Sequence, residues 1–249
     1  MTRPQAIVPL GDQAVFVEYA QVLDLKINAA VQRLAGRIRA REVGWLSDIV
    51  PTLGGVALYP NWTHSLLPAA PFDAIAQLVT ECIDDRSAAS AASSDVPVGR
   101  LIEVPVCYEP EYALDLSELS TQLKLRPEQI IARHLQPEYC VLMMGFVPGH
   151  PYLGGLDGAL TVPRRATPRA KVPAGSIAIA NGQSVIYPFP TPGGWTVIGR
   201  TPLRLFDAYR DPPCLFAPQD RVRFVAVSSA QFRAFKDDDV PRVPAAASV

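Results

Sequence analysis

Residues 145–206 read GFVPGHPYLGGLDGALTVPRRATPRAKVPAGSIAIANGQSVIYPFPTPGGWTVIGRTPLRLF, and this stretch decides the fold of the C-terminal half. It contains 10 of the 16 glycines in the chain, and proline recurs throughout it. Glycine and proline interrupt helices, so the stretch cannot be helical for long. The short apolar runs between the turns predict strands at 172–175, 184–187, 195–198 and 203–206, with another at 221–227. This pattern is typical of a barrel or sandwich.

The first part of the chain mixes strand and helix signals. Val15, Val17 and Tyr19 alternate with their neighbours and predict a strand. Asp24 then precedes an apolar stripe at helical spacing, two short strands are expected at 49–50 and 56–59, and a second helical stripe runs from 72 to 83. The order βαββα predicts a small α+β sandwich in which two helices cover one face of an antiparallel sheet.

The chain of 249 residues is long enough for two domains. Residues 87–100 are poor in large apolar side chains and predict a flexible linker. We therefore expect an α+β domain at 1–86, the linker at 87–100, a mainly β domain with two short helices at 101–240, and a tail at 241–249. Pro127 suits the first turn of the second of these helices, which runs to about His134.

Composition excludes several classes of function. The net charge of −1 provides no global attraction to nucleic acid or to a membrane surface, and the longest apolar run is too short to span a bilayer. The four cysteines lack metal-binding spacing, which indicates buried small side chains in a reduced, cytoplasmic protein with no metal site. Neither a P-loop nor a GxSxG nucleophile motif occurs, so any ATP used is not held by a P-loop of this chain.

Glycines at the start of the 145–206 stretch form the first candidate site. Gly145, Gly149, Gly154 and Gly155 permit positive φ and close backbone approach, so their N–H groups are available to a ligand. The alternative is that they only shape tight turns. Both interpretations stay open at this point.

A basic cluster forms the second candidate site. Arg164, Arg165, Arg169 and Lys171 lie in a proline-rich segment that cannot be a regular helix. A guanidinium group can hold a carboxylate or phosphate through a planar fork of donors. The alternative is a solvated surface run, which contributes little.

Three candidate catalytic residues carry polar side chains near these sites. His150 can move protons near neutral pH, and Tyr152 can donate a hydrogen bond to a developing oxyanion. Gln183 is the third, and it shares one face of a strand with Tyr187, a candidate substrate ligand; both point either into a barrel mouth or out to water. His134 lies at the end of a predicted helix, where the dipole favours a cation, and Trp195 is most simply a core or rim aromatic.

The stretch 145–206 resembles the carboxyltransferase C/D family. This family includes the B subunit of 5-oxoprolinase, Kip-type inhibitors of histidine kinases and part of biotin-dependent urea carboxylase. The resemblance implies a cyclophilin-like barrel for the C-terminal half. It gives Arg164 and Arg169 more weight as substrate ligands than Arg165 or Lys171, and Arg200, a further candidate substrate ligand, lies in another matching block. Family members commonly have an aromatic where His150 stands. The matching blocks are 145–146, 148–149, 152–156, 163–164, 167–169, 172–176, 192–195 and 198–202.

The resemblance implies a protein that acts with the A and C subunits of 5-oxoprolinase to convert the lactam 5-oxoproline to glutamate with ATP, which the complex and not necessarily this chain binds. Since the chain lacks a complete set of nucleophile, base and phosphate cradle, we expect a non-autonomous enzyme subunit. Two alternatives remain. One is an inhibitor that binds a histidine kinase, and the other is a carboxyltransferase component that works with biotin on another chain.

Overall fold

The computed structural model describes residues 2–20, 22–85 and 99–235. The chain separates into two compact units, residues 1–97 and 98–249. Nearly all of the predicted linker at 87–100 and the whole predicted tail at 241–249 lie outside the described residues.

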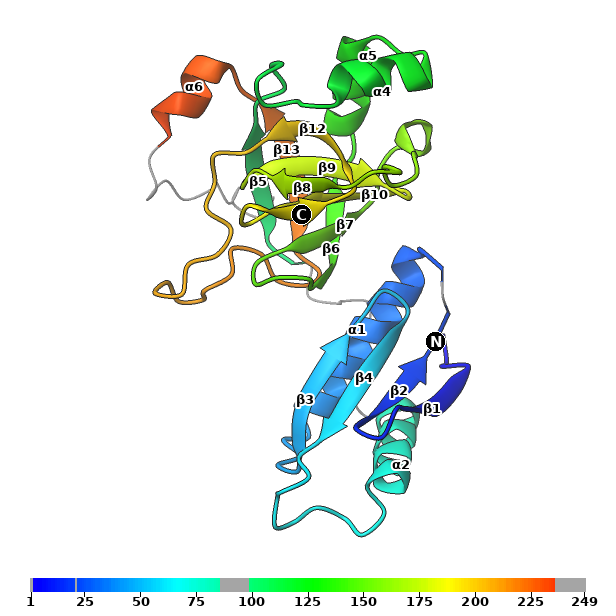
Figure 1. The fold of residues 1–249 in the computed structure, drawn as a ribbon. Coiled ribbons are helices and arrows are strands. Elements are labelled where there is room, and N and C mark those ends of the chain that lie inside the picture. Colours follow the sequence, from blue (N-terminus) through cyan, green and yellow to red (C-terminus); the bar gives the residue numbers. More distant parts are fainter. Residues whose placement is uncertain (1, 21, 86–98, 236–249) are drawn as a thin grey trace, which may run out of the picture. The chain divides into compact units, whose positions relative to one another are not determined.

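The first unit is a four-stranded antiparallel sheet with two helices (Figure 1). The strand order is β1-β2-β4-β3, and the predicted βαββα order is confirmed with one strand, β1, added before it. Its elements are β1 (Ala6–Leu10), β2 (Ala14–Glu18), α1 (Leu25–Arg39), β3 (Leu46–Pro51), β4 (Gly55–Pro60) and α2 (Pro71–Asp84).

Both helices of this unit pack on one face of the sheet, as predicted. The Asp24 carboxylate caps α1 by accepting hydrogen bonds from the backbone N–H groups of Lys26 and Ile27. Val17 and Leu58, which lie on the same face of neighbouring strands, belong to the buried cluster that includes residues of α1 and α2. Burial of this apolar face therefore stabilises the first unit independently of capping.

The second unit is built around a seven-stranded, barrel-like sheet of order β12-β9-β10-β7-β6-β13-β5, and β8 and β11 form a separate two-stranded antiparallel sheet. The elements are β5 (Leu101–Val106), α4 (Leu116–Leu123), α5 (Pro127–Leu135), β6 (Tyr139–Met144), β7 (Pro151–Gly154), η1 (Gly158–Leu160), β8 (Arg169–Val172), β9 (Ser176–Ala180), β10 (Gln183–Ile186), β11 (Thr191–Gly193), β12 (Thr196–Arg200), β13 (Arg221–Ala226) and α6 (Ser229–Ala234).

The two outermost strands of this sheet meet and nearly close the barrel. Cys107 N donates to Arg200 O at 2.9 Å, and Arg200 N donates to Cys107 O at 3.0 Å. Gly199 permits this approach, because a Cβ there would lie 2.8 Å from Cγ1 of Val106. The interior is filled by the larger apolar cluster, and α4 and α5 lie together at one end of the barrel (Figure 1). The mainly β character predicted for this half is confirmed.

Two predicted strands differ from the structure. Residues 203–206 form no strand, and only an isolated bridge joins Phe206 to Cys214. The strand predicted at 172–175 instead ends at Val172, because Pro173 and the positive-φ Gly175 begin a turn. Within the described ranges, no helix has the length and apolar character needed to cross a membrane.

Candidate functional site

One face of the barrel sheet brings together the polar residues predicted to be catalytic. Val185 lies directly opposite Tyr152 across β10 and β7, so alternation places His150 and Tyr152 on the same face as Gln183 and Tyr187. The His150 ring centroid lies 4.9 Å from that of Tyr152 and 5.3 Å from that of Tyr187. His150 and Tyr152 therefore share one surface of the sheet with Gln183 and Tyr187, which the sequence predicts to lie on one strand face.

His150 is enclosed in this cluster, with 3% of its surface exposed. Burial lowers the pKa of its imidazole to about 4, because desolvation disfavours the charged form. The expectation that it titrates near neutral pH is therefore corrected: the ring is neutral there. Its Nδ1 atom has no hydrogen-bond partner among the residues that the structure describes. A neutral imidazole with a free nitrogen can exchange hydrogen bonds with a polar ligand.

The tyrosines and the glutamine of this face are donors. Burial raises the pKa of Tyr152 and raises that of Tyr187 to about 12, so both hydroxyls stay protonated at neutral pH. Gln183 is buried, and its Nε2 atom has no partner within the described part of the chain. Trp195 is half-buried against the same cluster, which agrees with the prediction of a core or rim aromatic. This face offers hydrogen-bond donors without a fixed charge.

The predicted glycines mostly serve the protein's own packing. Gly149 has φ +79°, and a Cβ there would lie 2.7 Å from Cβ of Phe206. Gly155 has φ +104° and approaches the backbone carbonyl of Glu138, while Gly154 ends β7 as a buried residue. These contacts favour the turn-shaping alternative for Gly149 and Gly155.

The loop between β6 and β7 also contains a non-glycine residue with positive φ. Phe146 has φ +76°, although the side chain of a non-glycine residue disfavours that region, and the residue is 62% exposed. The ring lies edge-on to His150 with the centroids 5.5 Å apart. An exposed aromatic therefore covers the buried histidine at the loop between β6 and β7.

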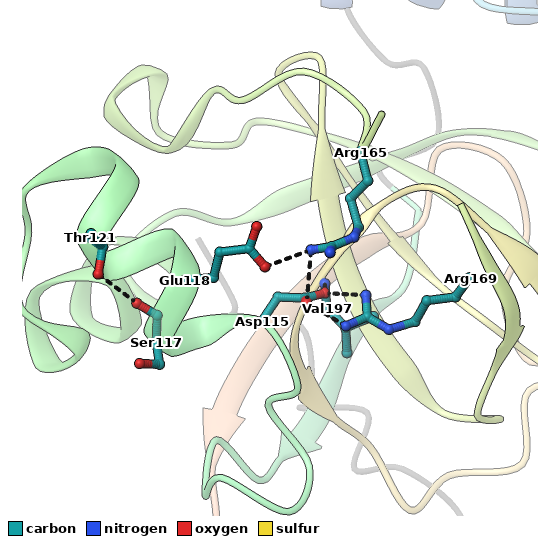
Figure 2. A network of polar contacts seen from close by, with 7 residues as sticks. All are labelled: Asp115, Ser117, Glu118, Thr121, Arg165, Arg169 and Val197. Atoms are coloured by element: carbon teal, nitrogen blue, oxygen red, sulfur yellow. Dashed lines mark hydrogen bonds and ion pairs between the residues drawn. The ribbon is translucent and has the colours of Figure 1, made fainter. Parts of the chain in front are cut away.

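Two arginines of the basic cluster are engaged by a buried carboxylate (Figure 2). Both Nη atoms of Arg169 donate to the two oxygens of Asp115, which is 1% exposed. Arg165 Nη1 donates to Asp115 and to Glu118 of α4, at 2.9 Å in each case. The backbone N–H of Val197 donates to the same carboxylate at 2.7 Å. Arg169, predicted as a substrate ligand, thus uses both Nη atoms in an internal ion pair.

Asp115 is a residue that sequence reasoning missed. It lies 50 residues before Arg165 and 54 before Arg169, so no local pattern marks it as their partner. Its carboxylate accepts hydrogen bonds from both guanidinium groups and from β12. Removing one partner of such a buried carboxylate leaves an unpaired buried charge, which strongly destabilises the fold.

Arg164 differs from its neighbours. It is exposed and forms no ion pair with a described residue. Its charge lowers the pKa of Tyr152 and Tyr187 against the larger effect of burial, which indicates that it lies near them. Arg164 also lines a hollow of about 410 Å³ beside α4, whereas Lys171 is exposed on β8 and does not line it.

Arg200 lies at a different place on the barrel. Its Nε donates to the carbonyl of Ala174 at 2.7 Å. It lines a second hollow of about 440 Å³, which Arg204 and Arg233 also line. Arg200, predicted as a substrate ligand, therefore lines a different hollow from Arg164.

His134 is corrected from a helix-end cation to a neutral core residue. It is fully buried near the end of α5, and burial lowers its pKa to about 3. The Tyr108 hydroxyl lies 2.7 Å from its Nδ1, and its ring stacks on Phe224 with centroids 4.5 Å apart. Desolvation outweighs the attraction of the helix dipole for a cation here.

Within the described ranges, no group of three or more His, Cys, Asp or Glu side chains is arranged to hold a metal ion. All four cysteines are free, and Cys82 and Cys107 are buried. The candidate site therefore offers hydrogen-bond donors, a neutral imidazole and a guanidinium group.

Comparison with known proteins covers nearly the whole chain. Residues 5–216 match the family described as carboxyltransferase domain, subdomain C and D. A Bacillus subtilis protein, named as the B subunit of 5-oxoprolinase, is 35% identical over 243 residues, which is 96% of this chain and 99% of that protein.

Solved structures show the same fold. The crystal structure of TTHA0988 superposes with a TM-score of 0.72 at 29% identity, covering 92% of this chain and 41% of that one, so the chain spans about two fifths of its length. The Kluyveromyces lactis urea carboxylase is similar with a TM-score of 0.66 at 16% identity, covering 94% of this chain and 24% of that one. At this identity the likeness extends to the fold alone.

Proposed function

The chain belongs to the carboxyltransferase C and D subdomain family, and on that premise we propose that it is the B subunit of an ATP-dependent 5-oxoprolinase. The complex would open the lactam of 5-oxoproline to give glutamate. The observation that carries the proposal is the 35% identity to a protein of that name over nearly the full length of both chains.

The sheet face with His150, Tyr152, Gln183 and Tyr187 is the proposed point of contact with the lactam. A carbonyl oxygen that gains negative charge as its amide is attacked is stabilised by donors such as the Tyr152 hydroxyl and the Gln183 amide. The neutral imidazole of His150 has a free nitrogen that can accept the lactam N–H. These roles bind and polarise the substrate, and they leave activation by ATP to the complex.

Partners are part of the proposal. We place the A and C subunits beside this chain, with ATP bound by the complex, because this chain's sequence has no P-loop. We also propose a cytoplasmic location and a cyclophilin-like barrel. The backbone pairing of Cys107 with Arg200 supports the latter, since it joins the outermost strands of the sheet.

No observation favours either alternative function. The similarity to urea carboxylase, at 16% identity, carries no argument beyond fold. Inhibition of a histidine kinase would be tested by adding the purified chain to a kinase assay, where we expect no effect.

Reconstitution tests the main proposal. The purified chain, the A and C subunits together, and the full set would each be assayed for glutamate formed from 5-oxoproline and ATP. We expect activity only from the full set. Full activity of this chain alone, full activity of the A and C subunits without it, or no activity of the full set would contradict the proposal.

A further inference from the structure

The hollow of about 410 Å³ beside α4 is lined by two kinds of surface. One wall is α4 itself, with Glu118 and Gln122, and the other is the segment 163–167 with Arg164. The volume is in the range of sites for small molecules. The lining residues are Glu118, Leu119, Gln122, Pro163, Arg164, Arg165, Ala166, Thr167 and Thr196.

Around the hollow, the guanidinium groups outnumber the carboxylates by one. Arg164, Arg165 and Arg169 contribute three guanidinium groups, and Asp115 and Glu118 contribute two carboxylates. The ion pairs of Figure 2 assign both carboxylates to Arg165 and Arg169. Arg164 is therefore the uncompensated cation, and the local balance suits a ligand with a single negative charge.

The ion pairs also fix the backbone that carries Arg164. Asp115 holds the side chains of Arg165 and Arg169, which follow Arg164 in the sequence, and the backbone N–H of Arg165 donates to Gly194 O at 2.7 Å. Arg164 also lies near Gly194, since a Cβ added there would be 3.7 Å from its Nε and Nη2 atoms. The guanidinium group is thus presented from a backbone anchored at several points.

We propose that this hollow is a subsite for one carboxylate group, with Arg164 as its ligand and Asp115 as a positioning residue. Thr167, Thr196 and Gln122 line the same hollow, and their hydroxyl and amide groups are the further donors of the proposed subsite. Glu118 disfavours a second negative charge, so a carboxylate is bound better than a phosphate dianion. Naming 5-oxoproline as the source of the carboxylate rests on the proposed function; the subsite itself does not.

Arginine labelling tests the subsite on the full-length chain without any assay of activity. Phenylglyoxal modifies accessible guanidinium groups, and mass spectrometry of peptides reports each arginine separately. We expect Arg164 to react several-fold faster than Arg165 and Arg169. We expect 5-oxoproline to protect it saturably, 2-pyrrolidone, the lactam without a carboxylate, to give no protection, and inorganic phosphate to protect less at equal concentration.

Four results would overturn the subsite. Three of them are equal labelling of the three arginines, equal protection by 2-pyrrolidone, and stronger protection by phosphate. Protection by every anion in proportion to ionic strength would also overturn it, since that result indicates screening alone.

Variants separate positioning from folding. Asp115→Asn should raise the labelling of Arg165 and Arg169 and weaken the protection of Arg164 by about tenfold in 5-oxoproline concentration. Asp220→Asn is the matched control, because Asp220 is also buried and ion-paired, but its partner Arg100 does not line the hollow, whereas Arg165, a partner of Asp115, does. Equal loss of protection in both variants would assign Asp115 a general structural role.

Arg164→Gln keeps the proposal testable if Asp115→Asn does not fold, because Arg164 is exposed. In the reconstituted complex it should raise KM for 5-oxoproline by about tenfold or more with a smaller change in kcat. An active complex with unchanged KM would overturn the subsite while the proposed function stands. An inactive wild-type complex whose Arg164 is still protected by 5-oxoproline would overturn the function while the subsite stands.

Discussion

The two buried histidines of the second unit are held neutral by desolvation. His134 has a pKa of about 3 and His150 one of about 4, both below the ordinary value of 6.5. As pH falls below 6.5, the unfolded chain takes up protons that the folded rings do not accept. The contribution of each ring is therefore fully present above that pH and is lost as pH falls toward the folded pKa.

His134→Asn tests this coupling. For each histidine, lowering the pH from neutral to 5.5 should reduce the free energy of unfolding by about 1.4 kcal/mol, because only the unfolded state binds the proton over that range. Urea denaturation at pH 7.5 and 5.5 should show a smaller loss of stability in the variant than in the wild type. An identical pH dependence in the two proteins would show that the ring accepts a proton when folded.

Tyr152→Phe tests the proposed donor on the sheet face. The variant removes one hydroxyl from the cluster with His150 and Tyr187, and the loss of an oxyanion donor typically costs about 10²-fold in kcat. We expect a fall of that order in the reconstituted complex, with little change in thermal stability. Tyr209→Phe, at a side chain that is 99% exposed, serves as the control and should keep full activity. Equal activity of the two variants would remove Tyr152 from the site.

At the scale of elements, closure of the barrel depends on the small residue at position 199. Gly199→Ala would bring a Cβ to 2.8 Å from Val106 Cγ1 and 3.1 Å from the Cys107 carbonyl. Overpacking of this kind costs about 1–3 kcal/mol, which urea denaturation would measure. Gly158→Ala is the control, since a Cβ there meets nothing within 4 Å. Equal stability of both variants would show that β5 and β12 separate without cost.

Local patterns predicted most of the elements, and long-range contacts explain the failures. The helix capped by Asp24 and the alternating strand at Val15 and Val17 carry their signals within a few residues. Residues 203–206 also alternate, but their strand pairing is limited to one isolated bridge, between Phe206 and Cys214. The site divides in the same way. Alternation predicted that Gln183 and Tyr187 share a face, whereas the partner of Arg169 lies 54 residues away and no local pattern marks it.

At the scale of the whole molecule, each unit has a hydrophobic core of its own. We expect a fragment of residues 99–249 to fold without the first unit, because its barrel core is drawn from residues within that range. Cooperative thermal unfolding of the fragment, followed by circular dichroism, would confirm this. A fragment without a cooperative transition would show that the barrel requires residues before 99.

The meeting of Cys107 with Arg200 also bears on self-association. A sheet whose outermost strands are joined presents less free edge for another chain to extend. The four-stranded sheet of the first unit differs, because β1 and β3 each pair on one side only among the described strands. Both contain a proline, Pro9 and Pro51, which lacks the N–H needed to add a strand. Among the described strands, those open to strand addition therefore lie mainly in the first unit, where the two prolines disfavour it.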